Sequence, residues 1–436
     1  MRFYDRSEEL NLLHTIAQRS KAHAEFTLLS GRRRIGKTAL LSEAFRDTTH
    51  LYLFVSRKSE RLLCAEYQQA AFEELGLQIY GSITSFKELF EQLMRFSQDR
   101  PLTLIIDEFQ DFERANPAIF SDIQDVWDHY KEKAKINLVV SGSLYSLLVR
   151  IFENEKEPLF GRLTNKIVLQ PFSTETVKKI LADNNPRYLQ EDLLCLYMLT
   201  GGVPKYLSLL MDAGAATKDA MLSYACGMGS PFLTDGKEVL VSEFGKDYGT
   251  YFSILQLIAS GKTAQPAIDS IIGKTTGAYL RNLEQDYSLI SKRQPMFAKP
   301  GSRAVRWRIR DCYLRFWFAF VYANQSLVET GRYDLLCELA ERGYESFTGL
   351  TLEDYYRAKY QEEGRFTQVG SYWDKKSENE IDLIALNTLD KEAVIAEIKR
   401  NSAKISLKGL QTKAQTLESE LKHYTLQFAA LSLADM

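Results

Sequence analysis

Hydrophobic and polar positions follow a regular order along the first 172 residues. Amphipathic helices are predicted where apolar residues recur at helical spacing, as in 5–19 and 85–97. Between and around such stretches, five apolar, β-prone runs predict strands at residues 26–30, 51–55, 102–106, 136–140 and 166–172. Because strands alternate with helices, we expect an α/β fold whose core is a five-stranded parallel sheet.

The pattern changes after residue 172. Residues 173–243 are helical in pattern. Residues 244–312 read as three short helices and a basic hairpin, which is the order of a winged helix-turn-helix. Residues 313–436 begin with a linker helix and continue into a small α/β domain, whose last helix is expected at 407–424. Together with residues 1–172, this division predicts four domains.

A phosphate-binding loop is predicted directly after the first strand. Residues 31–38, GRRRIGKT, fit the pattern G-x-x-x-x-G-K-[ST] at every fixed position, and a helical stretch follows. Gly31 and Gly36 let the backbone N–H groups point at phosphate oxygens. Lys37 is expected to reach the β- and γ-phosphates of ATP, and the Thr38 hydroxyl to hold Mg²⁺. The arginines inside the loop add positive potential, and Arg34 is included among the predicted nucleotide-binding residues.

Two carboxylates close the third strand. Asp107 is expected to hold Mg²⁺ through water, and Glu108 to orient and deprotonate the attacking water. A solvated acidic turn is the alternative. Ser141, at the end of the fourth strand, is predicted to sense the γ-phosphate or to align water. Ser143 has a comparable alternative role as the N-cap of the next helix.

A Gly-Arg turn and a Gly-Gly-Val-Pro segment follow later in the chain. Arg162 could supply charge in the transition state, either in its own site or in a neighbouring subunit, or it could be a structural surface residue. In Gly201–Pro204, the glycines end one helix and the proline suits the first turn of the next.

The C-terminal domain carries a second group of chemically capable residues. Asp382 opens one predicted strand, and Glu397 and Lys399 share one face of another because they are two residues apart. Glu353, on the preceding helix, is a third acid. Carboxylates can bind Mg²⁺ or Mn²⁺, and an ammonium can help to activate water. The alternatives are an inactive fold kept as a binding module and a chance surface pair.

These motifs together resemble the STAND branch of the AAA-related ATPases. More narrowly, the chain resembles the prokaryotic P-loop ATPase family that carries a C-terminal DUF234-type nuclease-like domain. The opening Phe3–Arg6 is similar to the start of that family, which covers the adenine. The resemblance implies that 173–243 is a lid, that Pro204 lies against the base, and that the winged helix also regulates the ATPase. The C-terminal cluster resembles a PD-(D/E)xK nuclease core, with Glu380–Asp382 in place of Pro-Asp.

Composition and charge narrow the possible partners. The net charge is −2, so nucleic-acid binding would need a local patch. Residues 271–315 supply one, because ten basic residues against three acids leave about +7 there. The five cysteines are widely spaced, which favours a reduced, cytoplasmic setting. No apolar run approaches the length of a membrane span.

The sequence therefore predicts an ATP-binding ATP hydrolase that needs Mg²⁺ and acts as a nucleotide-controlled switch. The switch would regulate a C-terminal DNA-binding or nuclease-like module. The sequence leaves open whether the protein forms a homo-oligomer. One alternative is a metal-dependent DNA nuclease that ATP regulates. Another is a nucleotide-gated scaffold that does not hydrolyse ATP.

Overall fold

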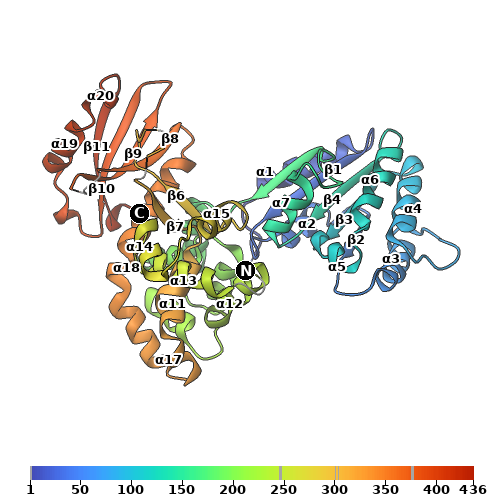
Figure 1. Cartoon of the computed structure of the whole chain (residues 1–436), viewed down its shortest axis with the longest axis horizontal. Helices are drawn as coiled ribbons and strands as arrows, with labels where there is room; N and C mark the ends of the chain where they lie inside the picture. The colour runs from blue at the N-terminus through green and yellow to red at the C-terminus, as the bar shows by residue number, and fades with distance from the viewer. Residues whose placement is uncertain (1, 245–247, 300, 303, 375–377) are drawn as a thin grey trace. The chain divides into compact units, whose positions relative to one another are not determined.

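The computed structural model describes residues 2–244, 248–299, 301–302, 304–374 and 378–436 (Figure 1). The chain forms two compact units. One is Asp5–Gln170, and the other is Pro171–Met436 together with the first residues up to Tyr4. The further boundaries predicted near residues 243 and 312 lie inside the second unit and stay predictions.

The first unit is built around the predicted five-stranded parallel sheet. Its strands occur in the order β2-β3-β4-β1-β5, and every neighbouring pair is parallel. The strands β1, β3 and β4 are almost fully buried, which explains their continuous apolar sequences. The strand bounds are β1 (Glu25–Gly31), β2 (His50–Phe54), β3 (Leu102–Asp107), β4 (Ile136–Ser141) and β5 (Asn165–Leu169).

Helices cover this sheet and complete its apolar core. Phe26 and Trp127 have ring centroids 5.0 Å apart in that core. Because all strands are parallel, the carboxyl ends of β1, β3 and β4 meet at one edge of the sheet. The helices include α1 (Ser7–Arg19), α2 (Lys37–Ala44), α3 (Glu60–Leu75), α4 (Phe86–Asp99), α5 (Phe112–Ala115), α6 (Ile119–Tyr130) and α7 (Tyr145–Glu153).

The second unit begins with a helical region. A close backbone approach explains one of its glycines, because a Cβ on Gly202 would lie 2.3 Å from the carbonyl oxygen of Phe172. Pro204 occupies the first turn of α10, as predicted from the Gly-Gly-Val-Pro segment. The helices are α8 (Thr174–Asn184), α9 (Gln190–Thr200), α10 (Pro204–Asp212), α11 (Lys218–Cys226) and α12 (Pro231–Phe244).

The expected order of three helices and a hairpin follows. The strands β6 and β7 pair antiparallel, with Ile290 opposite Ile309. Figure 1 shows this hairpin between α15 and the C-terminal sheet. The elements are α13 (Tyr248–Ala259), α14 (Gln265–Ile272), α15 (Gly277–Gln285), β6 (Ile290–Arg293) and β7 (Arg306–Ile309).

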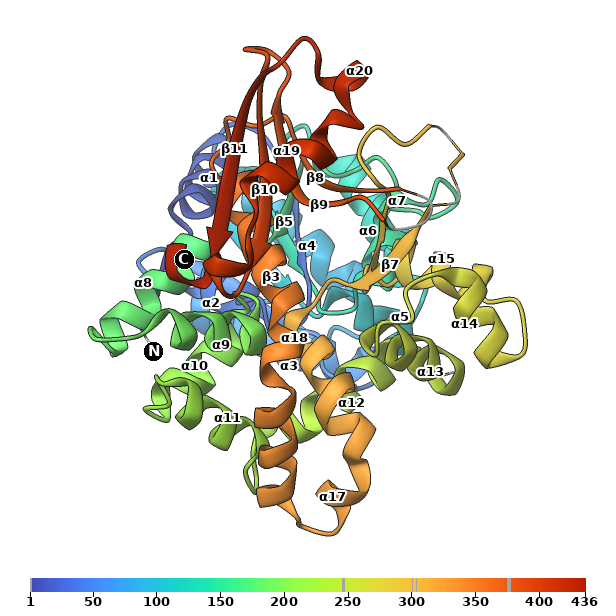
Figure 2. The ribbon, with the colours of Figure 1, turned by 90° about the vertical axis from the view of Figure 1, so that its left-hand side faces the viewer.

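A long helix leads into the C-terminal sheet (Figure 2). The sheet order is β11-β10-β9-β8, in which only the β10–β11 pair is parallel. The single helix expected at 407–424 is wrong: Leu417 turns into the core between two shorter helices. β11 follows them without having been predicted. The elements are α16 (Cys312–Phe316), α17 (Gln325–Glu329), α18 (Tyr333–Glu362), β8 (Gln368–Trp373), β9 (Glu380–Asn387), β10 (Glu392–Lys399), α19 (Leu407–Gln415), α20 (Glu418–Leu421) and β11 (Thr425–Ser432).

Candidate functional site

The loop between β1 and α2 has a backbone that its glycines make possible. Gly31 has φ +150°, and a Cβ there would lie 2.9 Å from the carbonyl oxygen of Leu169. Gly36 has φ +89° and precedes the first residue of α2. The Lys37 Nζ donates to the carbonyl oxygen of Gly31 at 2.9 Å, so its ammonium lies against the loop. Arg34 is a second left-handed position, with φ +74°.

Asp107 is the polar centre of this edge of the sheet. Its Oδ2 accepts hydrogen bonds from Thr38 Oγ1 at 3.1 Å and from the Tyr52 hydroxyl at 2.7 Å. Its Oδ1 accepts from the Ser141 hydroxyl and from the backbone N–H of Glu108. The structure thus brings together residues that are up to 103 positions apart (38 to 141). Sequence reasoning missed Tyr52.

The oxygen atoms of Thr38 and Asp107 fit a Mg²⁺ ion. A hydroxyl and a carboxylate 3.1 Å apart are the kind of ligands that Mg²⁺ takes when it also keeps several waters and phosphate oxygens. The hydrogen bond between them would be exchanged for contacts to the ion.

Glu108 lies directly beside this group, in a left-handed backbone conformation with φ +54°. Its Oε2 accepts hydrogen bonds from Gln110 Nε2 at 2.6 Å and from Ser143 Oγ at 2.7 Å. The alternative that Ser143 caps the following helix is wrong, because Leu144 is the N-cap of α7. Ser143 instead holds Glu108, whereas Ser141 contacts Asp107. Neither Gln110 nor this role of Ser143 was anticipated.

Arg162 lies at the opposite edge of the sheet from the phosphate-binding loop. It precedes β5, and its Nη2 donates to Asp128 Oδ2 at 3.1 Å. Gly161 before it has φ +72° and turns the chain. The structure therefore does not bring Arg162 to the phosphate loop of its own chain, and a role in a neighbouring subunit stays a prediction. The contact of Pro204 with adenine also stays a prediction.

In the second unit, the predicted C-terminal cluster comes together. Asp382 Oδ2 accepts hydrogen bonds from the backbone N–H of Ile398 at 2.8 Å and from Lys399 Nζ at 3.1 Å. Glu397 Oε1 lies 4.0 Å from Lys399 Nζ and 3.4 Å from Lys413 Nζ. Lys413, on α19, thus pairs with a carboxylate of this cluster.

The acids of this cluster face ammonium groups. Among the residues that the structure describes, no three His, Cys, Asp or Glu side chains are placed to hold a metal ion. Glu353 is close enough to Asp382 to be affected by its charge: burial, and then the Asp382 carboxylate, raise the pKa of Glu353 to about 7. The Mg²⁺ or Mn²⁺ site expected from the sequence at this cluster stays a prediction.

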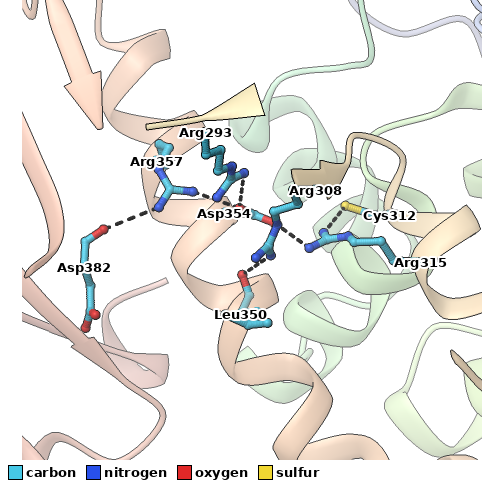
Figure 3. A network of polar contacts seen from close by, with 8 residues as sticks. All are labelled: Arg293, Arg308, Cys312, Arg315, Leu350, Asp354, Arg357 and Asp382. Atoms are coloured by element: carbon cyan, nitrogen blue, oxygen red, sulfur yellow. Dashed lines mark hydrogen bonds and ion pairs between the residues drawn. The ribbon is translucent and has the colours of Figure 1, made fainter. Parts of the chain in front are cut away.

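The arginines of the basic hairpin do not form an exposed surface of the kind that binds DNA. Figure 3 shows that Arg293, Arg308 and Arg315 turn inward to Asp354 on α18. Arg357 joins them from the same helix. Of the ten basic residues counted at 271–315, Arg303 lies outside the described residues.

Comparison with known proteins decides the family. Residues 3–210 match the model of an ATPase domain predominantly from Archaea, and residues 317–413 match that of DUF234, archaeal and bacterial proteins of unknown function. The chain combines an archaeal-type ATPase domain with a DUF234 domain. This confirms the family that the motifs resemble.

Two known proteins are similar over most of this ATPase–DUF234 chain. An uncharacterized protein of Methanocaldococcus jannaschii is 27% identical over 414 residues, which are 91% of this chain and 87% of that protein. The structure of a Walker-type ATPase of Pyrococcus abyssi superposes with a TM-score of 0.54 and 19% identity, over 73% of this chain and 96% of the other. The second likeness confirms the P-loop α/β fold. Within the described residues, every helix is too short or too polar to cross a membrane.

Proposed function

We propose that this chain hydrolyses ATP and uses the nucleotide as a switch that regulates its C-terminal unit. The observation that carries the proposal is the placement of Thr38, Asp107 and Glu108 at one edge of the parallel sheet, beside the Lys37 loop. The membership of residues 3–210 in an ATPase family supports it.

Each residue of this edge has a separate task in the proposed reaction. The loop N–H groups and Lys37 would hold the β- and γ-phosphates. Thr38 and Asp107 would hold Mg²⁺, which neutralises charge on those phosphates. Glu108, held by Gln110 and Ser143, would orient the attacking water and accept its proton. The lid role of residues 173–243 and the contact of Pro204 with adenine belong to the same proposal.

The test is Mg²⁺-dependent phosphate release from ATP by the full chain. Glu108→Gln should lower the rate by about 10²–10⁴-fold, because a general base is lost, while ATP is still bound. Glu113→Gln is a matched control, since Glu113 lies in the same unit and pairs with Arg150 at the surface. An unchanged rate in Glu108→Gln would contradict the assigned role.

A second function is favoured by one observation, the contact of Lys399 with Asp382 beside Glu397. This arrangement supports DNA cleavage or DNA binding by the DUF234 domain. Nicking of plasmid DNA with Mn²⁺ that persists in the Asp382→Ala, Lys399→Ala double variant would exclude cleavage by this cluster. Contacts with DNA through the winged helix, and a homo-oligomeric assembly, are further parts of the proposal.

A further inference from the structure

A large cavity lies within the second unit, away from the phosphate loop in sequence. Its volume is about 690 Å³, which falls in the range of pockets that take small organic ligands. The end of α13, the hairpin β6–β7, the helix α18 and the strands β8 and β9 all contribute to its wall. Five arginines line it: Arg293, Arg306, Arg308, Arg315 and Arg357.

Positive charge exceeds negative charge in this wall. Four of the guanidinium groups share the single carboxylate of Asp354, with contacts of 2.8 Å from Arg293, 2.6 Å from Arg315 and 2.9 Å from Arg357, in addition to Arg308 (Figure 3). These four guanidinium groups and the Asp354 carboxylate together carry a net charge of +3. Glu353 and Asp382 also line the cavity, and even when both are ionised a net charge of +1 remains.

The excess charge is held out of water. Burial, opposed by Asp354 but reinforced by the guanidinium groups of Arg315 and Arg293, lowers the pKa of Arg308 to about 10. A group of like charges packed this closely is stabilised by an additional anion, because each buried ion needs a partner. Arginine is suited to phosphate, which its planar group can bind through two parallel hydrogen bonds.

Three hydrogen-bond donors in this wall lack acceptors. Within the described residues, Trp307 Nε1, Arg308 Nε and Arg315 Nε are buried and have no hydrogen-bond partner. Trp307 is only 7% exposed and Arg315 only 8%, yet both line the cavity. A buried donor without an acceptor costs about 1–3 kcal/mol, so an acceptor oxygen that a bound ligand brought within reach of these donors would stabilise the wall.

One side of the cavity offers an aromatic surface. The Arg306 guanidinium lies 4.4 Å from the centre of the Trp373 ring, and it pairs with Glu380 at 2.5 Å. Because Trp373 is buried and the Arg306 guanidinium lies over its ring, a planar base would stack on the guanidinium plane beside the tryptophan. Aromatic surface next to clustered arginines is the combination that recognises a nucleotide rather than an inorganic anion alone.

We infer that this cavity is a second nucleotide site, which binds a phosphorylated mono- or dinucleotide through its arginines and stacks a base near Trp373. The phosphate could belong to a free nucleotide or to the 5′ end of a DNA strand. The inference does not depend on ATP hydrolysis at the phosphate loop. It goes beyond the proposed switch, because it gives the C-terminal unit a ligand of its own.

The test uses the full chain with Lys37→Ala, so that the phosphate loop contributes little to binding. The probes are the 5′-phosphorylated thymidine dinucleotide, the same dinucleotide without the phosphate, and a longer 5′-phosphorylated thymidine strand, titrated by calorimetry. The phosphorylated dinucleotide should bind at least about tenfold more tightly than the unphosphorylated one. Binding of the long strand as well identifies the strand end as the source of the phosphate, and its exclusion identifies a free nucleotide.

Variants connect that binding to this cavity. Arg306→Gln should weaken binding of the phosphorylated dinucleotide about tenfold, and Glu380→Gln should strengthen it, because a competing carboxylate is removed. Arg306 is outside the Asp354 cluster, so its replacement leaves the buried ion pairs intact. Arg281→Gln, at an exposed position of α15, is the matched control and should bind normally. Equal affinity for the two dinucleotides, unchanged affinity in Arg306→Gln, or binding of the long strand alone would each overturn the inference.

Discussion

Two adjacent carboxyl groups on α18 are expected to affect the stability of the second unit in opposite directions when each is replaced by its neutral amide. The guanidinium groups around Asp354, foremost Arg308, overcome the effect of burial and hold the pKa of its carboxyl well below the usual range. Burial raises the pKa of Glu353 from 4.5 to about 7. At pH 8 we therefore expect Asp354→Asn to destabilise the second unit and Glu353→Gln to stabilise it.

The sizes of the two effects follow from the contacts. Removing one partner of a buried ion pair costs about 3–5 kcal/mol, and Asp354 is the partner of four arginines. The shift of the Glu353 pKa corresponds to about 3 kcal/mol at 1.36 kcal/mol per unit, which we discount to about 2 kcal/mol because the side chain is partly exposed.

The pH dependence of the Glu353 effect has a definite sign. The folded state binds this proton more tightly than the unfolded state does, so the unfolding free energy falls as the pH rises from about 4.5 to about 7. Below that window the carboxyl is neutral in both the folded and the unfolded state, so Glu353→Gln should hardly change the unfolding free energy. Above it the stabilisation should be complete.

The assay is urea unfolding followed by tryptophan fluorescence at pH 4 and pH 8. Of the four tryptophans, Trp127 alone belongs to the first unit, so a Trp127→Phe background confines the signal to the second. Glu345→Gln, at an exposed position of α18, is the control and should change the unfolding free energy by less than about 0.5 kcal/mol. Equal signs for the two variants at pH 8, or a Glu353→Gln gain that is the same at both pH values, would refute the reasoning.

Two further predictions concern the other parts of the chain. Gly202→Ala should lower the unfolding free energy by at least about 2 kcal/mol more than Gly214→Ala does, measured by thermal unfolding. Both residues have positive φ, but a Cβ at Gly202 would lie 2.3 Å from the carbonyl oxygen of Phe172, whereas a Cβ at Gly214 would meet open space. Equal melting temperatures for the two variants would contradict this. Tyr52→Phe removes a hydrogen bond to Asp107 and should lower the unfolding free energy of the first unit by about 1–2 kcal/mol, measured by Trp127 fluorescence; no loss would show that the bond is not formed.

The sheet of the first unit could be predicted because its local signals agree with its tertiary structure. Buried parallel strands are largely apolar, and the motif at 31–38 fixes which edge carries the chemistry. The parallel topology then brings Asp107 and Ser141 together without further information. Tyr52 could not be recognised, since its importance comes from the pairing of β2 with β3, which no local pattern specifies.

The second unit was harder to predict from the sequence where charged residues are buried, because the fold then decides which groups they pair with. β11 lies at the edge of its sheet and alternates poorly, with half of its residues exposed, so it lacks the pattern that identifies a strand. Asp354 lies next to the predicted acid Glu353 in the sequence, and only the fold shows which of the two carboxyls is surrounded by arginines. Asp354 is shared by Arg357, one turn along the same helix, and by three arginines that are distant in the sequence, and this arrangement leaves no local signature.

The burial of these arginines also changes what the winged-helix segment can bind. Of the nine basic residues that the structure describes in 271–315, four line the cavity, and five are exposed: Lys274, Arg281, Lys292, Lys299 and Arg310. Sequence-independent affinity for DNA grows with the number of phosphates that are neutralised. The surface of this segment can therefore neutralise about half as many phosphates as its composition implies. The positive charge of the other four residues lies in the cavity, where the low dielectric strengthens its attraction for a single small anion.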